Sequence, residues 1–207
     1  MKSSKKVEIY LKYYMDKLFS IIGLIILSPI FLLIGLILKF QGEDIFFLQK
    51  RIGYLGEEFE VFKFTTMPKG SEKLGLITTP NDPRTSKLGK FLRKTSLNEV
   101  PQLINILKGD MSFVGPRPLV QIKKYLNDDE TIKYYRMSPG ITGLASLYYY
   151  EEDELLGSVE NSYEYYEKVI MPKKQKLEDD YYKNYSTFLD VKIIFLTLKK
   201  VLYDRYK

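Results

Sequence analysis

The sequence predicts a mostly helical α+β protein that is attached to one side of a membrane by a kinked, re-entrant N-terminal helix. Three observations support this prediction: a long apolar segment near the N-terminus, two short strand patterns after it, and amphipathic helical patterns further along the chain. We expect a single domain over residues 1–207, with a re-entrant membrane helix at 18–38 and the rest of the fold at 41–207.

The apolar segment covers residues 18–38 and contains no charged side chain. At about 1.5 Å per residue, a helix of this length matches the hydrocarbon core of a bilayer. The segment is too long for the apolar part of a signal peptide, and no small-residue cleavage site follows it. A buried core helix is the alternative, but such helices rarely run so long without a charge.

Charge and proline placement favour a helix that enters and leaves the membrane on the same side. Ser28-Pro29 lies in the middle of the segment, and proline removes a helical hydrogen bond and clashes with the carbonyl four residues earlier. We therefore expect a kink, with the Ser28 hydroxyl as one partner for the freed carbonyl. A straight span stays open as the alternative. The positive-inside rule selects neither end, because basic residues flank both: Lys2, Lys5, Lys6, Lys12 and Lys17 before the segment, and Lys39, Lys50, Arg51 and Lys63 after it.

The rest of the chain predicts a small hairpin and several helices. Residues 45–49 and 58–64 read as short strands around Gly53 and Gly56, and residues 68–87 read as a loop. Helical periodicity returns at 87–93 and 97–108. The pattern at 188–203 fits an amphipathic helix at the membrane interface or, equally, a helix packed on the soluble part. The 18 Tyr residues suit the headgroup zone of a membrane, and packing on the surface of the soluble part is the alternative for many of them.

Composition restricts the chemistry. The chain has neither Cys nor His, which excludes disulfides, thiolate nucleophiles, imidazole bases and cysteine or histidine zinc sites. Carboxylates, Lys, Arg, Tyr and hydroxyls remain, together with a hard oxygen-bound cation such as Mg²⁺. The net charge of +6 indicates a phosphate-rich or anionic partner. Nucleic acid is disfavoured as the partner, because the chain has no recognised nucleic-acid motif and such binding leaves the membrane segment unexplained.

The candidate site lies between residues 92 and 118. Ser96 and Glu99 have the spacing of a capping box that opens a helix, and Gly109 lies where a left-handed C-terminal cap belongs. The free N–H groups of a helix start suit a phosphate. In Gly115-Pro116-Arg117-Pro118, two prolines restrict the backbone around Arg117, whose guanidinium can bind phosphate oxygens in pairs. A capping role for Glu99 and a surface role for Arg117 are the alternatives.

These residues resemble the signature of the bacterial sugar transferases, the small monotopic phosphoglycosyl transferases. Shorter matches are Gln49-x-Arg51-x-Gly53, Phe62-Lys63-Phe64, Asp82-Pro83-Arg84, Pro139-Gly140-Ile141-Thr142-Gly143 and Leu189-Asp190-Val191-Lys192-Ile193-Ile194. The resemblance covers nearly the whole chain, and it implies a re-entrant helix broken at Ser-Pro. The long, specific block is Leu92-Arg93-Lys94-Thr95-Ser96-Leu97-Asn98-Glu99-Val100-Pro101-Gln102-Leu103 with Lys108-Gly109-Asp110-Met111-Ser112-Phe113-Val114-Gly115-Pro116-Arg117-Pro118.

The resemblance implies an enzyme at the cytoplasmic face of the bacterial inner membrane. Such enzymes transfer a sugar phosphate from a nucleotide diphosphate sugar to undecaprenyl phosphate and so start the assembly of surface polysaccharides or glycoconjugates. It implies Mg²⁺ held by Glu99, with Asp110 as a second candidate ligand. A homodimer is left open, and residues 41–207 become the cytoplasmic catalytic and interfacial part. Together, Lys63, Arg84, Arg93 and Arg117 are expected to form the positive surface that binds a diphosphate, and an ordinary surface position is the alternative for each of the first three taken singly.

One departure from the family pattern falls on the catalytic pair, an Asp-Glu in the family. Asn98 stands where the pattern has the nucleophilic Asp, while Glu99 keeps the second position. A carboxamide is uncharged and a weak nucleophile, so a covalent phosphosugar intermediate is not expected. The chain could be a variant made to trap substrate, a natural relative with another mechanism, or a non-enzymatic binding protein. Further departures at Thr65 and at 144–146 favour natural divergence, in which Glu99 serves as metal ligand or base and Asn98 donates to the phosphate.

Overall fold

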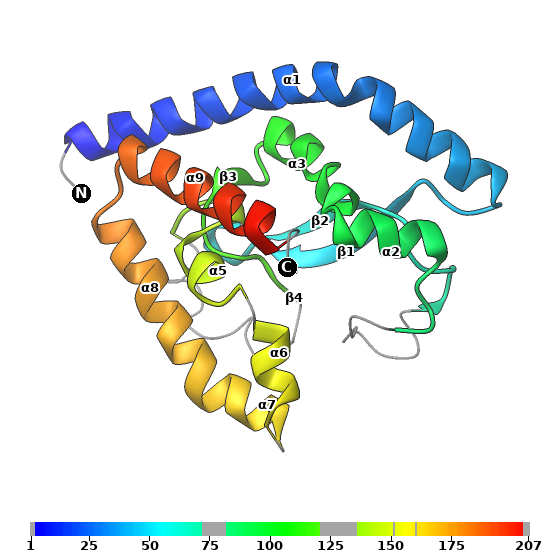
Figure 1. The fold of residues 1–207 in the computed structure, drawn as a ribbon. Coiled ribbons are helices and arrows are strands. Elements are labelled where there is room, and N and C mark those ends of the chain that lie inside the picture. The colour runs from blue at the N-terminus through cyan, green and yellow to red at the C-terminus, as the bar shows by residue number, and fades with distance from the viewer. Residues whose placement is uncertain (1–2, 72–81, 121–135, 151, 160, 205–207) are drawn as a thin grey trace.

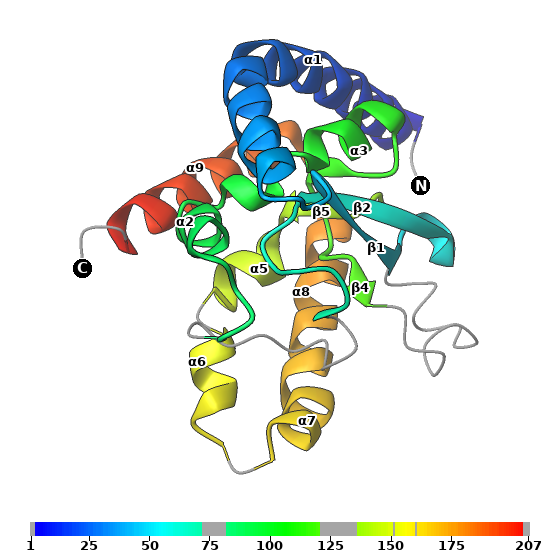
Figure 2. The same ribbon diagram turned by 90° about the vertical axis from the view of Figure 1, so that its right-hand side faces the viewer.

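The structure is a computed structural model, and it describes residues 3–71, 82–120, 136–150, 152–159 and 161–204. A single long helix, α1 (Ser3–Phe40), lies along one side of the molecule, over α3 (Gln102–Lys108) and α9 (Thr187–Asp204) (Figure 1). The opposite end is formed by α6 (Glu152–Gly157), α7 (Ser162–Tyr165) and a π-helical turn at Tyr166–Ile170 (Figure 2). From there α8 (Met171–Lys183) runs back to the start of α9. The protein is mostly helical with small sheets, as predicted.

Helix α1 contains the apolar segment and extends well before it. In the described chain, it is the one helix long and apolar enough to cross a membrane, over Val7–Phe40, and only 17% of its most apolar window is buried. The ribbon changes direction near its middle (Figure 1). Proline at position 29 cannot bond to the carbonyl of Ile25, and the Ser28 hydroxyl donates to that carbonyl at 2.8 Å. The predicted local partner for the freed carbonyl is therefore confirmed.

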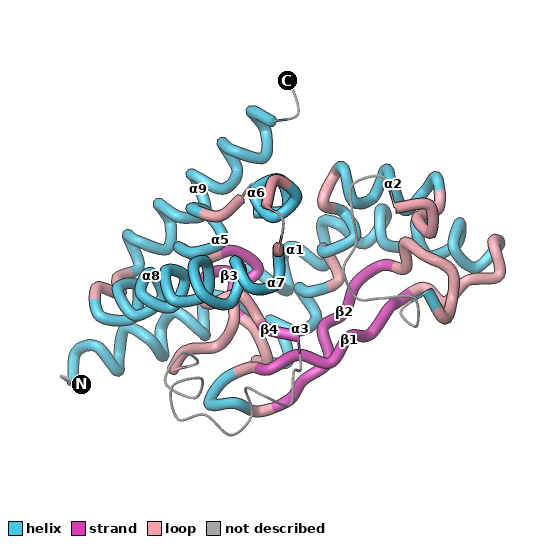
Figure 3. Tube along the Cα trace, turned by 90° about the horizontal axis from the view of Figure 1, so that it is seen from below, coloured by secondary structure: helices cyan, strands magenta, loops and turns pink. Residues whose placement is uncertain are grey.

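The predicted hairpin is confirmed. Strands β1 (Phe46–Ile52) and β2 (Glu58–Phe64) pair antiparallel across the turn Tyr54–Gly56, with Phe46 opposite Phe64. The short β4 (Leu119–Val120) adds to the other edge of β1 and gives the order β2-β1-β4 (Figure 3). A second sheet has two parallel strands, β3 (Ser112–Val114) and β5 (Gly140–Thr142).

Helices α2 (Lys87–Lys94) and α9 occupy the predicted segments, but the helix expected at 97–108 is divided. Leu97–Glu99 forms a 3₁₀ turn called η3, and α3 starts only at Gln102, after Pro101. Proline favours the start of a helix because it has no N–H to satisfy. Gly109 does close α3 in the left-handed region, at φ 93°. The loop predicted at 68–87 lies partly outside the described residues, and its end gives way to α2 at Lys87.

A buried polar network fastens the start of α1 to the rest of the fold. The Lys12 ammonium lies 2.6 Å from an Asp190 carboxylate oxygen, and Tyr181 donates to the other oxygen at 2.6 Å. Asp16 accepts from the Ser112 hydroxyl at 2.6 Å. Because buried charges are costly unless they are paired, these contacts hold α1, α8, α9 and β3 in one arrangement. The inner face of α9, including the fully buried Ile193, packs on the same core.

Candidate active site

Glu99 is positioned by a strained turn between α2 and α3. Ser96 adopts a left-handed backbone conformation at φ 57°, which is uncommon for a residue other than glycine, and its side chain caps no helix. The capping box predicted from Ser96 and Glu99 is therefore wrong. Glu99 bonds to Lys63 of strand β2 instead of to the Ser96 backbone. As a result, the carboxylate points away from the turn and toward the β1–β2 hairpin.

The Lys63–Glu99 pair forms the centre of the site. The Lys63 ammonium donates to Glu99 Oε1 at 3.0 Å, and both side chains are mostly buried. The charge of Lys63, with smaller contributions from Arg117 and Arg51, lowers the pKa of Glu99 from 4.5 to about 2. Burial lowers the pKa of Lys63, and Glu99 opposes that change. Glu99 is thus an anion among several cations throughout the physiological pH range.

Arg117 and Arg51 supply two of these cations. Arg51 donates to the Pro118 carbonyl at 3.1 Å and to Gln49 Oε1 at 2.6 Å, which ties strand β1 to the Arg117 segment. Arg117 itself is exposed to solvent and acts electrostatically on both Glu99 and Lys63. The structure therefore places Arg117, 18 positions further along the chain, close enough to Glu99 for the two charges to interact. Arg51 was part of a sequence motif but was not among the predicted site residues.

The backbone around Arg117 is fixed by close contact with the segment before α5 (Leu144–Tyr148). Gly115 N–H donates to the Thr142 carbonyl at 2.9 Å, and Gly140 N–H donates to the Pro116 carbonyl at 2.9 Å. A Cβ atom on Gly115 would lie 2.3 Å from the Ser138 carbonyl oxygen, and one on Gly140 would lie 2.1 Å from the Gly115 nitrogen. Only glycine fits where two backbones approach this closely, so the two glycine motifs work as one unit.

Arg84 and Arg93 extend the positive region on the α2 side. The Asp82 carboxylate accepts from Arg84 Nε at 2.9 Å and from Nη2 at 2.6 Å, and these bonds lower the pKa of Asp82 to about 2. Arg93 donates to the Thr66 hydroxyl at 3.0 Å and interacts electrostatically with Asp82, Arg84 and Glu99. Its position therefore links the Asp82–Arg84 pair to the Glu99 centre. Asp82 holds Arg84 in place and was not among the predicted site residues.

Asn98 and Asp110 lie on opposite ends of α3. Asn98 is half-buried in η3 beside Glu99 and forms no side-chain hydrogen bond to the described part of the chain. Asp110 follows the other end of the helix, 3.2 Å from the Lys108 ammonium and 3.3 Å from the Asn105 amide nitrogen. Asn105 in turn binds the backbone of strand β2 through Phe62 N–H and the Glu60 carbonyl. Asp110 therefore belongs to the contact between α3 and the hairpin.

A second charged cluster, absent from the sequence prediction, borders Arg117. Lys174 of α8 bonds to Glu152 of α6 and lies over the rings of Tyr149 and Tyr166, 5.7 and 5.3 Å from their centroids. Its pKa is lowered mainly by burial, and the charge of Arg117 contributes. Glu178, one turn further along α8, has its pKa raised by burial to about 7. No local pattern marks these residues in the sequence, because 57 positions separate Arg117 from Lys174.

The donor atoms at this site fit a Mg²⁺ ion that is shared with a substrate. Protein sites for Mg²⁺ commonly use one or two carboxylates together with substrate phosphates and water. Glu99 offers such a carboxylate, with Oε1 bonded to Lys63. In the described ranges no group of three or more Asp and Glu residues forms a closed metal cage. Within the described residues, the site thus offers one carboxylate for a shared ion rather than a closed set of protein ligands.

Comparison with known proteins agrees with this arrangement. The family model described as "Bacterial sugar transferase" matches residues 7–204. The exopolysaccharide production protein ExoY of Rhizobium meliloti is 36% identical, over 92% of this chain and 84% of that protein. The uncharacterized sugar transferase EpsL of Bacillus subtilis is 38% identical, over 78% of this chain and 71% of EpsL.

Some relatives are longer than this chain, which covers less than half of their length. The undecaprenyl-phosphate galactose phosphotransferase of Salmonella typhimurium is 34% identical over 96% of this chain, which covers 42% of that enzyme. The Haemophilus influenzae uncharacterized sugar transferase is likewise covered over 41% of its length. Since the family model spans the apolar helix, the charged site and α9 alike, the whole described fold takes part in the match. The chain belongs to the bacterial sugar transferase family and is a membrane-associated protein.

Proposed function

We propose that this chain transfers a sugar phosphate from a nucleotide diphosphate sugar to undecaprenyl phosphate and thereby starts the synthesis of a surface polysaccharide. Relatives are named as undecaprenyl-phosphate galactose and glucose phosphotransferases. The observation that carries the proposal for this chain is the Lys63–Glu99 pair, which sits within electrostatic reach of Arg51 and Arg117. Such a cluster suits a reaction in which two phosphate groups approach each other.

The membrane arrangement that we propose follows from α1 and α9. In α1, Ser28-Pro29 lies at the middle of the apolar segment, and both ends of the helix carry lysines. A re-entrant course would keep both ends on the cytoplasmic face of the inner membrane, where nucleotide sugars are available. In α9, the face turned away from the core carries Phe188, Phe195 and Leu198, which are 56–78% exposed. This face would rest on the membrane surface.

Asn98 leads us to propose a direct displacement. The second pKa of a phosphate monoester is about 6, so the acceptor phosphate is largely dianionic at neutral pH and requires no base. One of its oxygens would attack the β-phosphorus of the donor, forming the new P–O bond as the bond to the α-phosphate oxygen breaks. The nucleoside monophosphate leaves with that oxygen. No proton moves, and no residue becomes covalently modified.

The individual residues take roles that match their charges. A carboxylate with a pKa of about 2 is a poor proton acceptor, so we assign Glu99 the role of metal ligand and charge organiser rather than base. When bound, Mg²⁺ would neutralise charge on the phosphates. Arg117, exposed at the edge of the site, would bind the donor phosphates, with Arg93 and Arg84 extending the binding surface. The Asn98 amide would donate to a phosphate oxygen.

A transfer assay with stereochemical readout tests the proposal. Purified protein, Mg²⁺, undecaprenyl phosphate and a panel of nucleotide diphosphate sugars are expected to give a lipid-linked sugar diphosphate and the nucleoside monophosphate. With a donor made chiral at the β-phosphorus, direct displacement inverts the configuration, whereas two successive displacements retain it. The Asn98→Asp variant is the matched comparison. No transfer with any donor, or retention by the unaltered chain, would reject the proposed route.

A non-enzymatic role as a binding or scaffold protein is the second candidate, and Asn98 is the observation in its favour. The two roles differ in their dependence on Glu99. A transferase loses turnover when Glu99 is replaced by Ala, whereas a scaffold keeps its association with other membrane proteins. Measuring turnover and association on the same Glu99→Ala preparation separates them.

A further inference from the structure

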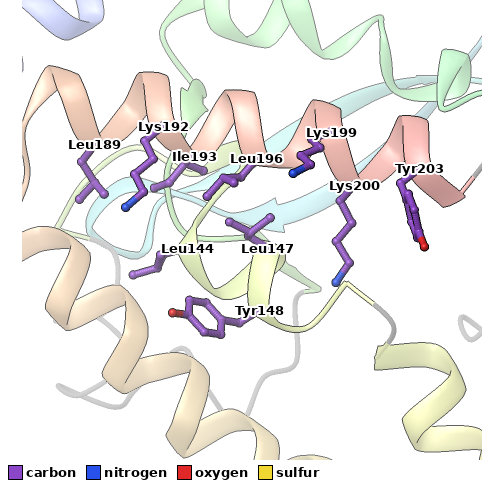
Figure 4. A pocket seen from close by; sticks show the side chains of 10 residues that line it. All are labelled: Leu144, Leu147, Tyr148, Leu189, Lys192, Ile193, Leu196, Lys199, Lys200 and Tyr203. Atoms are coloured by element: carbon purple, nitrogen blue, oxygen red, sulfur yellow. The ribbon is translucent and has the colours of Figure 1, made fainter.

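A groove separate from the charged site runs between α5 and α9. It has a volume of about 680 Å³, within the range of ligand-binding cavities, and its walls are mainly apolar. In Figure 4, Leu144 and Leu147 of α5 face Ile193 and Leu196 of α9 across the groove. Neither the Lys63–Glu99 pair nor Arg117 lines it. It is therefore a second candidate site, with a lining suited to a hydrocarbon chain.

Leu189, three lysines and the tyrosines Tyr148 and Tyr203 complete the lining of the groove. Lys200 lies 4.9 Å from the centroid of the Tyr150 ring, while Lys192 and Lys199 are exposed. Neither Lys192 nor Lys199 forms an ion pair with a described carboxylate. The acidic residue of the first turn of α9, Asp190, is already bound to Lys12 and Tyr181. The groove thus combines apolar walls with uncompensated positive charge, a combination that fits an amphiphilic anion.

The position of the groove on α9 indicates where such a ligand comes from. The neighbouring face of the same helix exposes a row of apolar side chains spaced three and four positions apart. In a membrane-associated protein, a row of this kind turns toward the lipid, which places the groove beside the bilayer surface. The row consists of Phe188, Val191, Phe195, Leu198 and Leu202.

We infer that the α5–α9 groove binds one hydrocarbon chain of an anionic phospholipid from the surrounding bilayer, with the lipid headgroup held by Lys192 and Lys199. The phosphate of the sugar acceptor has to reach Glu99 and Arg117 in the proposed reaction, so it cannot stay with the α9 lysines. A ligand whose phosphate remains at the groove fits better. The choice of a phospholipid over the sugar acceptor rests on the proposed function, whereas binding of a lipid chain in the groove depends only on membrane association, so each can fail without the other.

Tryptophan fluorescence can test the inference directly, because the chain contains no Trp. Leu147→Trp places a single reporter in the groove, and Phe195→Trp places one on the exposed face of α9. Each full-length variant is reconstituted into vesicles that contain brominated phosphatidylglycerol or brominated phosphatidylcholine over the same series of mole fractions. The groove reporter should be quenched at a lower fraction of the anionic lipid, whereas the exposed reporter should respond equally to both.

Lys192 and Lys199 determine how strongly the groove prefers phosphatidylglycerol to phosphatidylcholine. A basic residue at an anionic membrane surface contributes a preference of about fivefold, so Lys192→Ala and Lys199→Ala should each weaken the preference for phosphatidylglycerol by about that factor. Lys176→Ala is the matched control, since Lys176 is exposed on α8 outside the groove. Circular dichroism verifies that each variant is folded.

Three results would overturn the inference. The groove reporter could show no quenching by either lipid, or equal quenching by both that the lysine variants leave unchanged. Alternatively, trace undecaprenyl phosphate could relieve the quenching in the presence of excess phosphatidylglycerol. That last result would assign the groove to the isoprenyl chain of the acceptor.

Discussion

The charge environment of Glu99 predicts a specific dependence of stability on pH. Lowering the pKa of Glu99 from 4.5 to about 2 corresponds to about 3 kcal/mol of additional stability at neutral pH. This is an upper figure, because 29% of the Glu99 side chain is exposed and solvent screens the interaction. Since the pKa is lower in the folded state, the contribution is complete above the unfolded value of 4.5 and is lost as the pH falls toward 2.

Replacing Glu99 by Gln removes this contribution and leaves Lys63 beside Arg51 and Arg117. For a chain of this size, about 3 kcal/mol corresponds to a decrease in Tm of about 6–12 °C. We expect this difference from the parent protein at pH 7, and we expect it to shrink steadily from pH 5 to pH 3. Thermal unfolding in detergent, followed by circular dichroism at matched ionic strength, measures it.

Glu57→Gln is the control, because Glu57 is exposed at the hairpin turn. Its Tm should stay within about 2 °C of the parent, as expected for a surface substitution. A Glu99→Gln difference that is constant from pH 7 to pH 3 would refute the reasoning. So would a more stable variant at neutral pH, because either result would mean that Glu99 is not held ionised by its neighbours.

Three further predictions concern other parts of the fold. Gly140→Ala should lower both the Tm and the transfer rate because its Cβ would overlap the backbone before Arg117, whereas Gly157→Ala, with open space at the Cβ position, should change neither. Lys12→Met should lower the Tm by about 6–20 °C by leaving the buried Asp190 carboxylate without its cation, and equal stability would show the pair to be dispensable. Arg117→Lys should raise the KM for the donor about tenfold through loss of paired hydrogen bonds, and initial rates that give an unchanged KM would remove Arg117 from the donor site.

Local patterns predicted much of the fold. The hairpin, α2, α9 and the contact of Ser28 with the Ile25 carbonyl follow from periodicity and proline chemistry within short windows. The predicted capping box is wrong because of a contact with a residue outside the four-residue segment that suggested it. The Ser-x-x-Glu spacing was present, but the left-handed backbone at Ser96 and the long-range pairing of Glu99 with Lys63 took its place.

The sequence predicted less of the candidate site than of the fold. Lys63, Glu99 and Arg117 were named from motifs. The packing of β2 against η3 and α3 brings Lys63 to Glu99, and the bond from Arg51 to the Pro118 carbonyl holds the Arg117 segment against β1. Lys174 and Glu178 carry no local signal, because only the packing of α8 brings them to the Arg117 side. A buried lysine in the middle of a charged helix looks in the sequence like any solvent-exposed one.

The most direct test of the central claim is sugar-phosphate transfer measured side by side for the parent protein, Glu99→Gln and Glu57→Gln. Each is assayed in nanodiscs with Mg²⁺, undecaprenyl phosphate and a nucleotide diphosphate sugar, and the lipid product is quantified by mass spectrometry. We predict product from the parent and from Glu57→Gln, and a loss of at least about 100-fold in rate for Glu99→Gln, as for removal of one electrostatic group at a reacting centre. Equal rates for all three proteins would contradict the assignment of Glu99 to the reaction.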